Sequence, residues 1–158
     1  MPPTRSRSRR ANVTVIQSTF LPAVLAKLRD LKKLEVHIGS WGDEDIAMVA
    51  GVLEHGSQKM QIPARSFIGS GKKKSAAAIS KLVRAGVNDI ANDQTTARTL
   101  LAEIGELGKE RTLKNFDKIR SPALSPIYAK RKGSKKILIM EKKLRDSISY
   151  VVVTKGRG

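Results

Sequence analysis

Residues 20–55 read FLPAVLAKLRDLKKLEVHIGSWGDEDIAMVAGVLEH, and this stretch decides the fold class. Within it, residues 20–34 carry apolar side chains at positions 21, 24, 25, 28 and 31, which is the spacing of one helix face. Residues 34–39 then alternate apolar and polar side chains, as a half-buried strand does. Residues 43–55 return to helical spacing, with three acids where a helix N-terminus favours negative charge. The mixture of helix and strand predicts an α+β domain.

The flanking sequence extends this pattern in both directions. Residues 12–17 (NVTVIQ) predict a short strand, and residues 1–11, rich in Pro, Ser and Arg, predict a flexible basic arm. We expect residues 57–70 to form an ordered loop, followed by helices over residues 72–91 and 94–119. The second helix is the longest, and its two internal glycines weaken it by up to about 1 kcal/mol each and allow a bend.

The C-terminal part contains fewer regular segments. We expect a loop or extended arm over residues 121–136, a helical turn or two over residues 141–147, a closing strand over residues 148–154, and a tail over residues 155–158. The sequence therefore predicts one α+β domain over residues 12–154. Its small antiparallel sheet is packed with several helices, one of them long, and flexible basic arms are attached to it.

Composition limits the class of protein. The net charge is +17, from 31 Lys and Arg against 14 Asp and Glu, which favours nucleic acid or acidic protein partners. Residues 41–70 are the exception, with four acidic groups against two basic ones, so head-to-tail pairing with copies of the same chain is a further hypothesis. Cysteine is absent, and the longest apolar stretch, residues 46–53, is too short to span a bilayer. We expect a soluble protein without membrane contact.

No motif for enzymatic chemistry is visible. His37 and His55 match no zinc-ligand spacing, and no cysteine adds ligands. The three adjacent acids at residues 43–45 point in different directions on a helix, so they do not converge on one site. Residues 69–72 (GSGK) lack the upstream glycine and the following Ser or Thr of a phosphate loop. The sequence predicts a non-enzymatic protein without metal or cofactor.

Basic side chains gather in three clusters that could contact DNA phosphates or an acidic partner. A solvated cationic surface is the alternative reading, and the lack of interleaved aromatic residues or a known reading motif disfavours sequence-specific recognition. The candidate contact residues are Arg5, Arg7, Arg9, Arg10, Lys72, Lys73, Lys74, Lys130, Arg131 and Lys132.

Three segments, in this order, are similar to elements of the tail-completion, neck and virion-morphogenesis (minor tail) protein family of tailed bacteriophages. Residues 47–57 (AMVAGVLEHGS) resemble its apolar helix followed by Glu-x-Gly-Thr/Ser, and residues 62–68 (IPARSFI) resemble its Pro-x-Arg-Pro-Phe-Leu element. Residues 138–148 (LIMEKKLRDSI) resemble its closing Leu-x-x-Thr-Gly-x-Leu-x-x-Ser-Ile segment. Ser66 stands where that family usually has Pro, and Glu141 with Lys142 replaces its Thr-Gly turn.

The resemblance implies a structural virion protein that forms a ring, of six subunits, at the head–tail junction and joins the tail to the connector. Its partners would be copies of itself and other phage neck, connector and tail proteins, with non-specific contact to DNA in the channel. It would be located in the virion, and in the host cytoplasm during assembly. A tail terminator and a head-side adaptor are alternatives within this class, and a free, non-specific nucleic-acid-binding protein is the alternative outside it.

The same three segments supply candidate interface residues. Gly56 is expected to end a helix in a left-handed conformation, and Arg65 to reach a carboxylate, either Glu54 or one on a neighbour. Leu144 and Ile148 are expected to pack inward, with Ser147 ending a short helix. The predicted interface residues are Glu54, Gly56, Pro63, Arg65, Phe67, Leu144, Ser147 and Ile148.

Overall fold

The computed structural model describes residues 21–123, 130 and 142–156. The predicted arm over residues 1–11, the predicted strand over residues 12–17 and most of the predicted loop over residues 121–136 lie outside this part of the chain. The described elements are α1 (Leu21–Lys32), β1 (Leu34–Ser40), α2 (Glu44–His55), α3 (Ile68–Ala91), α4 (Ala97–Lys118), α6 (Lys142–Ser147) and β2 (Ile148–Thr154). They confirm the predicted α+β class.

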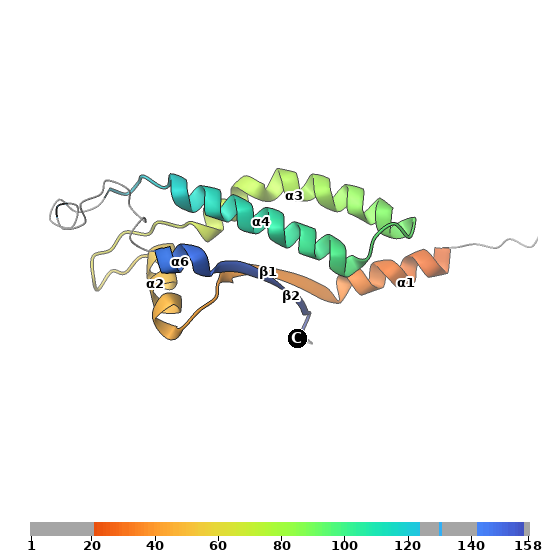
Figure 1. Ribbon diagram of the computed structural model, residues 1–158, viewed down its shortest axis with the longest axis horizontal. Helices are drawn as coiled ribbons and strands as arrows, with labels where there is room; N and C mark the ends of the chain where they lie inside the picture. Colours follow the sequence, from red (N-terminus) through yellow and green to blue (C-terminus); the bar gives the residue numbers. More distant parts are fainter. Residues whose placement is uncertain (1–20, 124–129, 131–141, 157–158) are drawn as a thin grey trace, which may run out of the picture.

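A two-stranded antiparallel sheet joins the two ends of the described chain. β1 pairs with β2 so that Leu34 lies opposite Thr154 and Ser40 lies opposite Ile148. Helix α4 packs on both strands, and α3 packs on α4 and α1 rather than on the sheet, so that α4 lies between α3 and the strands (Figure 1). The molecule is elongated, with α1 and α2 at its opposite ends (Figure 1).

The glycines of α4 bring the helix close to the sheet. A Cβ added to Gly105 would lie 2.2 Å from Cδ2 of Tyr150, and one added to Gly108 would lie 2.2 Å from Cδ1 of Ile38. Helix α4 continues through both positions without interruption. Their low helix propensity is thus offset by close packing against the strands, a reason that the sequence pattern alone did not reveal.

Helix α3 begins earlier than the sequence predicts. It starts at Ile68 rather than at residue 72, so the predicted loop over residues 57–70 is too long by three residues. The residue before it, Phe67, provides no side-chain cap. The first amide groups are instead satisfied by a carboxylate from α2, Glu54, which a local capping pattern cannot show.

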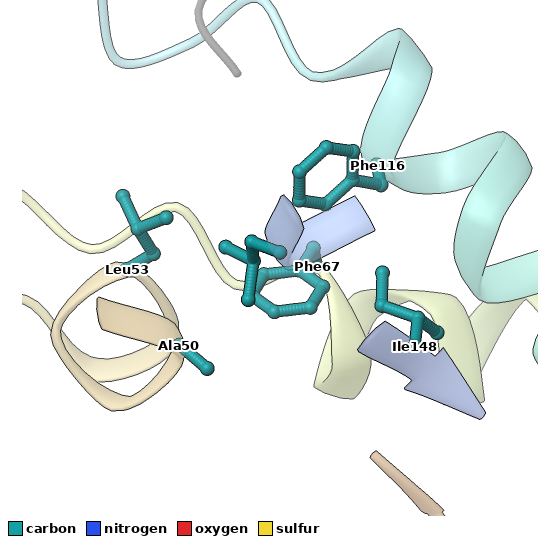
Figure 2. Close-up of a cluster of buried hydrophobic side chains, with 6 residues drawn as sticks. Ala50, Leu53, Phe67, Phe116 and Ile148 are labelled. Atoms are coloured by element: carbon teal, nitrogen blue, oxygen red, sulfur yellow. The ribbon is translucent and has the colours of Figure 1, made fainter. Parts of the chain in front are cut away.

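The hydrophobic core is divided into two clusters. The first joins α2, α3, α4, α6 and β2 around Phe67 and Phe116, whose rings meet edge to face at 5.2 Å between centroids (Figure 2). Leu144 and Ile148 belong to this cluster, which confirms their predicted inward packing, and Ser147 is the last residue of α6. The second cluster joins α3 and α4 to α1 and the sheet, and its buried members are Ile90, Ala97, Leu100, Leu101 and Ile104.

Candidate subunit interface

A part-buried network of hydrogen bonds anchors the loop between α2 and α3. The carboxylate of Glu54, in the last turn of α2, accepts hydrogen bonds from the backbone N–H groups of Phe67, Ile68 and Gly69 at 2.8–2.9 Å. It also accepts one from the hydroxyl of Ser66 at 2.6 Å. An anion at a helix N-terminus is stabilised by the free amides and by the helix dipole. The carboxylate therefore occupies the place where an external anion would otherwise bind.

This environment changes the acidity of Glu54. Burial raises the pKa of its carboxyl, but the hydrogen bonds from Ser66, Gly69, Ile68 and Phe67 together outweigh burial, so the pKa lies below its usual value. Each of these bonds favours the charged form. Glu54 is therefore held as a carboxylate and stabilises the α2–α3 junction when ionised.

Arg65 does not bind a carboxylate within the described chain, so the predicted pairing with Glu54 is wrong. Its Nε donates to the carbonyl oxygen of Pro122 at 3.1 Å, and its Nη2 donates to that of Ala123 at 3.2 Å. The side chain is buried, with the residue 7% exposed. The physical reason is that Glu54 is already bonded by nearby backbone amides, which leaves Arg65 to tie the loop to the segment after α4.

Asn115 completes this network and was not predicted. It lies on the buried face of α4, and its Nδ2 donates to the carbonyl of Phe67 at 2.8 Å and to Ser70 Oγ at 2.6 Å. The ammonium of Lys74 donates to its Oδ1 at 2.5 Å. The one signal in the sequence was the position of this residue. Residue 115 continues the helical spacing of positions 104, 108 and 112, which form the buried face of α4.

Gly56 and Pro63 lie on the surface side of the same loop. Gly56 has φ 79° and ψ 175°, so the expected positive φ is confirmed, although ψ is extended rather than that of a left-handed helix. A Cβ there would lie 2.9 Å from the backbone of Ala64, so only glycine fits. Both residues line an open hollow of about 730 Å³.

Apart from Glu54, which bonds the start of α3, the predicted interface residues therefore divide into three groups. Phe67, Arg65, Leu144 and Ile148 are buried within the chain, so their side chains hold the loop and α6 in place and present no surface to a neighbour. Ser147 is half-buried and bonds Ser40 and the carbonyl of Leu144. Only Gly56 and Pro63 lie where a neighbour could contact them directly through the hollow.

The basic residues predicted to contact DNA or an acidic partner are exposed where the structure describes them. Lys72, Lys73 and Lys74 follow one another in α3, and Lys130 is exposed as well. The other predicted contacts, Arg5, Arg7, Arg9, Arg10, Arg131 and Lys132, lie outside the described residues. The structure thus places one basic cluster on a helix surface.

Large apolar side chains are exposed at both ends of the molecule. At the end formed by α1, Leu21 is 60% exposed and Leu25 43%. At the end formed by α2 and the turn before it, Trp41 is 50% exposed, Met48 61% and Val49 37% (Figure 1). Exposed apolar groups that gather at one place are typical of contact surfaces.

The residues considered for chemistry have structural partners. His37 is exposed and its Nε2 lies 3.2 Å from Glu35 Oε2, a contact that lowers the pKa of the Glu35 carboxyl. Asp43 caps α2 by accepting from the N–H of Ile46 at 3.0 Å. In the described ranges, no group of three or more His, Asp or Glu could hold a metal ion. No helix in these ranges is long and apolar enough to cross a membrane.

Comparison with known proteins gives no relative: no family model, no curated protein and no solved structure matches this chain.

Proposed function

We propose that this chain is a structural subunit that assembles head to tail with copies of itself into a ring in the neck or upper tail of a tailed bacteriophage. The observation that carries the assembly is the presence of two different exposed apolar ends on an elongated body (Figure 1). When two different surfaces bind each other, every chain of subunits still has one unbound surface of each kind at its two ends. These ends meet and close a ring when the rotation between successive subunits adds up to a full turn. A ring of six around the DNA path is the form that the family resemblance implies.

Charge supports the same arrangement. Residues 41–70, which include the α2 end, carry a net negative charge, whereas the chain as a whole carries +17. The acidic α2 end of one copy therefore meets a basic neighbour, which favours contact between unlike ends over contact between two α2 ends. The rigid loop held by Glu54 and Arg65 gives this end a fixed shape.

Two charge substitutions test the head-to-tail contact. Leu25→Glu disrupts the α1 end and Met48→Glu disrupts the α2 end, both at exposed positions where the fold tolerates a charge. We expect each variant alone to be monomeric in sedimentation velocity, and an equal mixture of the two to form dimers only, through the one intact pair of ends. A contact between like ends predicts instead that each variant still dimerises alone, and that result would exclude the proposed arrangement.

The place in the virion needs a separate measurement. Mass spectrometry of purified particles followed by cryo-electron microscopy of the neck should find a few copies in a ring at the head–tail junction or the tail end. Absence of the chain from finished particles would contradict the virion assignment and would leave ring formation as an independent question.

Non-specific nucleic-acid binding is the second candidate, favoured by the net charge and by the exposed Lys72–Lys74 cluster. Fluorescence anisotropy with duplex DNA at several salt concentrations distinguishes the two. A stable monomer that binds DNA with a steep salt dependence would favour this second function, because each neutralised phosphate releases counterions.

A further inference from the structure

An open groove lies beside α4. It is bounded by β1 on one side of this helix and by α3 on the other. Its volume is about 540 Å³, and its lining includes Val36 and Ile38 of β1, Ile68 and Ile79 of α3, and Ile104 and Thr112 of α4. Ile68 packs on the first core cluster, whereas Ile79, Ile104 and Val36 belong to the second. The groove therefore lies where the two halves of the core would otherwise meet.

One edge of β1 carries backbone hydrogen-bonding groups that no described residue uses. Trp41 N–H donates to the Ser147 carbonyl at 2.9 Å, and Lys155 N–H donates to the Lys33 carbonyl at 2.7 Å. Since bonded pairs alternate along an antiparallel ladder, the odd-numbered residues of β1 bond β2. The N–H and C=O groups of Val36 and Ile38 therefore point away from β2, and no described residue bonds them. Such an edge is a template for another strand.

Thr112 lies at the base of the groove, and its Oγ1 packs against α3, since a Cβ added to Gly71 would lie 3.0 Å from it. A polypeptide segment in the groove, with its backbone amides and carbonyls, would supply partners for the β1 edge.

One segment of this chain has the composition that the groove requires. Residues 12–17 (NVTVIQ) alternate as a strand does, with Val13 and Val15 on one face and Thr14 and Ile16 on the other. The segment is joined through residues 18–20 to Leu21, at the outer end of α1 (Figure 1). The 12 residues of α1 carry this end about 18 Å away from the start of β1. In the head-to-tail arrangement proposed above, this end meets the α2 end of a neighbour, so residues 12–17 come beside that neighbour.

We propose that residues 12–17 of one copy add as a third strand to the free edge of β1 in the neighbouring copy. Val13 and Val15 then enter the groove beside Ile68 and Ile79, and the added backbone bonds Val36 and Ile38. The mode is strand addition, in which main-chain hydrogen bonds give affinity and alternate side chains fill pockets. A segment that arrives from the α2 end of the neighbour runs parallel to β1. This inference rests on the head-to-tail ring proposed above.

Disulfide trapping tests the contact directly, because the natural chain has no cysteine. In a strand beside β1, Thr14 lies on the same face as His37, whose side chain is exposed, so Thr14→Cys in one copy and His37→Cys in another come within bonding distance. The two single-cysteine variants are mixed and oxidised. We expect a reducible dimer on the order of ten times more abundant than the dimer from Thr14→Cys mixed with Glu106→Cys, whose side chain is exposed on α4. Gly39→Cys with Ile16→Cys should crosslink as well if the strands are parallel.

The outcomes separate the inference from the function on which it depends. Dimer yield equal to the α4 control overturns the strand addition. So does a double variant, Thr14→Cys with His37→Cys, that forms an internal disulfide and remains monomeric, because the segment would then occupy its own groove. Deletion of residues 1–17 should raise the concentration at which rings form on the order of 100-fold, as expected for the loss of a few backbone hydrogen bonds.

Rings that survive this deletion unchanged overturn the inference and leave the proposed ring intact. A natural chain that stays monomeric at every concentration overturns the ring itself.

Discussion

Replacing glycines in helices tests how closely α4 packs on the sheet. Alanine is favoured over glycine in a helix by about 1 kcal/mol, so a Gly→Ala change with free space around it stabilises the protein. Gly51, in α2, has no atom within 4 Å of an added Cβ. We expect Gly51→Ala to raise the free energy of unfolding by roughly 0.5–1 kcal/mol, which for a chain of this size corresponds to an increase of about 1–4 °C in melting temperature.

Gly105→Ala should have the opposite effect. Its Cβ would lie 2.2 Å from Tyr150 Cδ2, 2.6 Å from Cγ and 2.7 Å from Cε2, so the ring as a whole must move. Overpacking of this kind costs about 1–3 kcal/mol against a helix gain of about 1 kcal/mol, so the net loss in free energy of unfolding is up to about 2 kcal/mol. Gly108→Ala should fall between the two, because only the terminal Cδ1 of Ile38 is too close and the next atom is 3.6 Å away.

Urea unfolding followed by circular dichroism measures all three variants, with the wild-type chain as reference. The expected order of stability is Gly51→Ala, then Gly108→Ala, then Gly105→Ala, with only the first above wild type. Equal stabilisation by Gly51→Ala and Gly105→Ala would refute the close approach of α4 to β2, and with it the position of the groove at the other strand.

Three further changes address the loop and the arm. Glu54→Gln should lower the free energy of unfolding by about 2 kcal/mol at pH 7, because the N–H groups of Phe67, Ile68 and Gly69 lose a charged acceptor. Since the folded-state pKa of Glu54 lies below its unfolded value, its stabilisation is complete above about pH 4.5 and is lost as pH falls through the folded pKa. Unfolding curves of variant and wild type should therefore converge at low pH, and a constant difference would contradict this role. Arg65→Met should lower the free energy of unfolding by about 1–2 kcal/mol, because the carbonyls of Pro122 and Ala123 lose their donor. It should also speed tryptic cleavage after Arg120. An unchanged cleavage rate would argue against a role of Arg65 in holding the segment after α4. Deletion of residues 1–11 should weaken ring assembly or DNA binding and shift the melting temperature by less than about 2 °C, whereas loss of the folded circular-dichroism spectrum would show that the arm belongs to the domain.

The sequence alone predicted the helices and strands whose apolar residues follow one regular spacing. The apolar spacing of residues 20–34 and the alternation of residues 34–39 correspond to α1 and β1, and the alternation of residues 148–154 corresponds to β2. The acids at residues 43–45 and Gly56 indicated the two ends of α2, although Asp43 is the N-cap and not, as predicted, the first helical residue. Each of these features depends on neighbours within a few residues, so the sequence contains the whole cause.

Contacts between residues far apart in the chain could not be predicted from the sequence in this way. The start of α3 depends on Glu54, which is 14 residues before Ile68, and the partner of Arg65 lies 57 residues later in the chain. Asn115 reaches Phe67 across 48 residues. The sequence offered several carboxylates and carbonyls to each of these groups, and only the folded positions selected among them.

The sequence by itself determined the α+β class, the strong positive charge and the elements with regular spacing, because these follow from local composition and periodicity. Only the tertiary structure decided that the glycines of α4 serve close packing, that Arg65 binds carbonyl oxygens, and that no described segment pairs with the second edge of β1 beside the groove. These features arise when segments far apart in the chain meet, and the free energy of those contacts outweighs local preference.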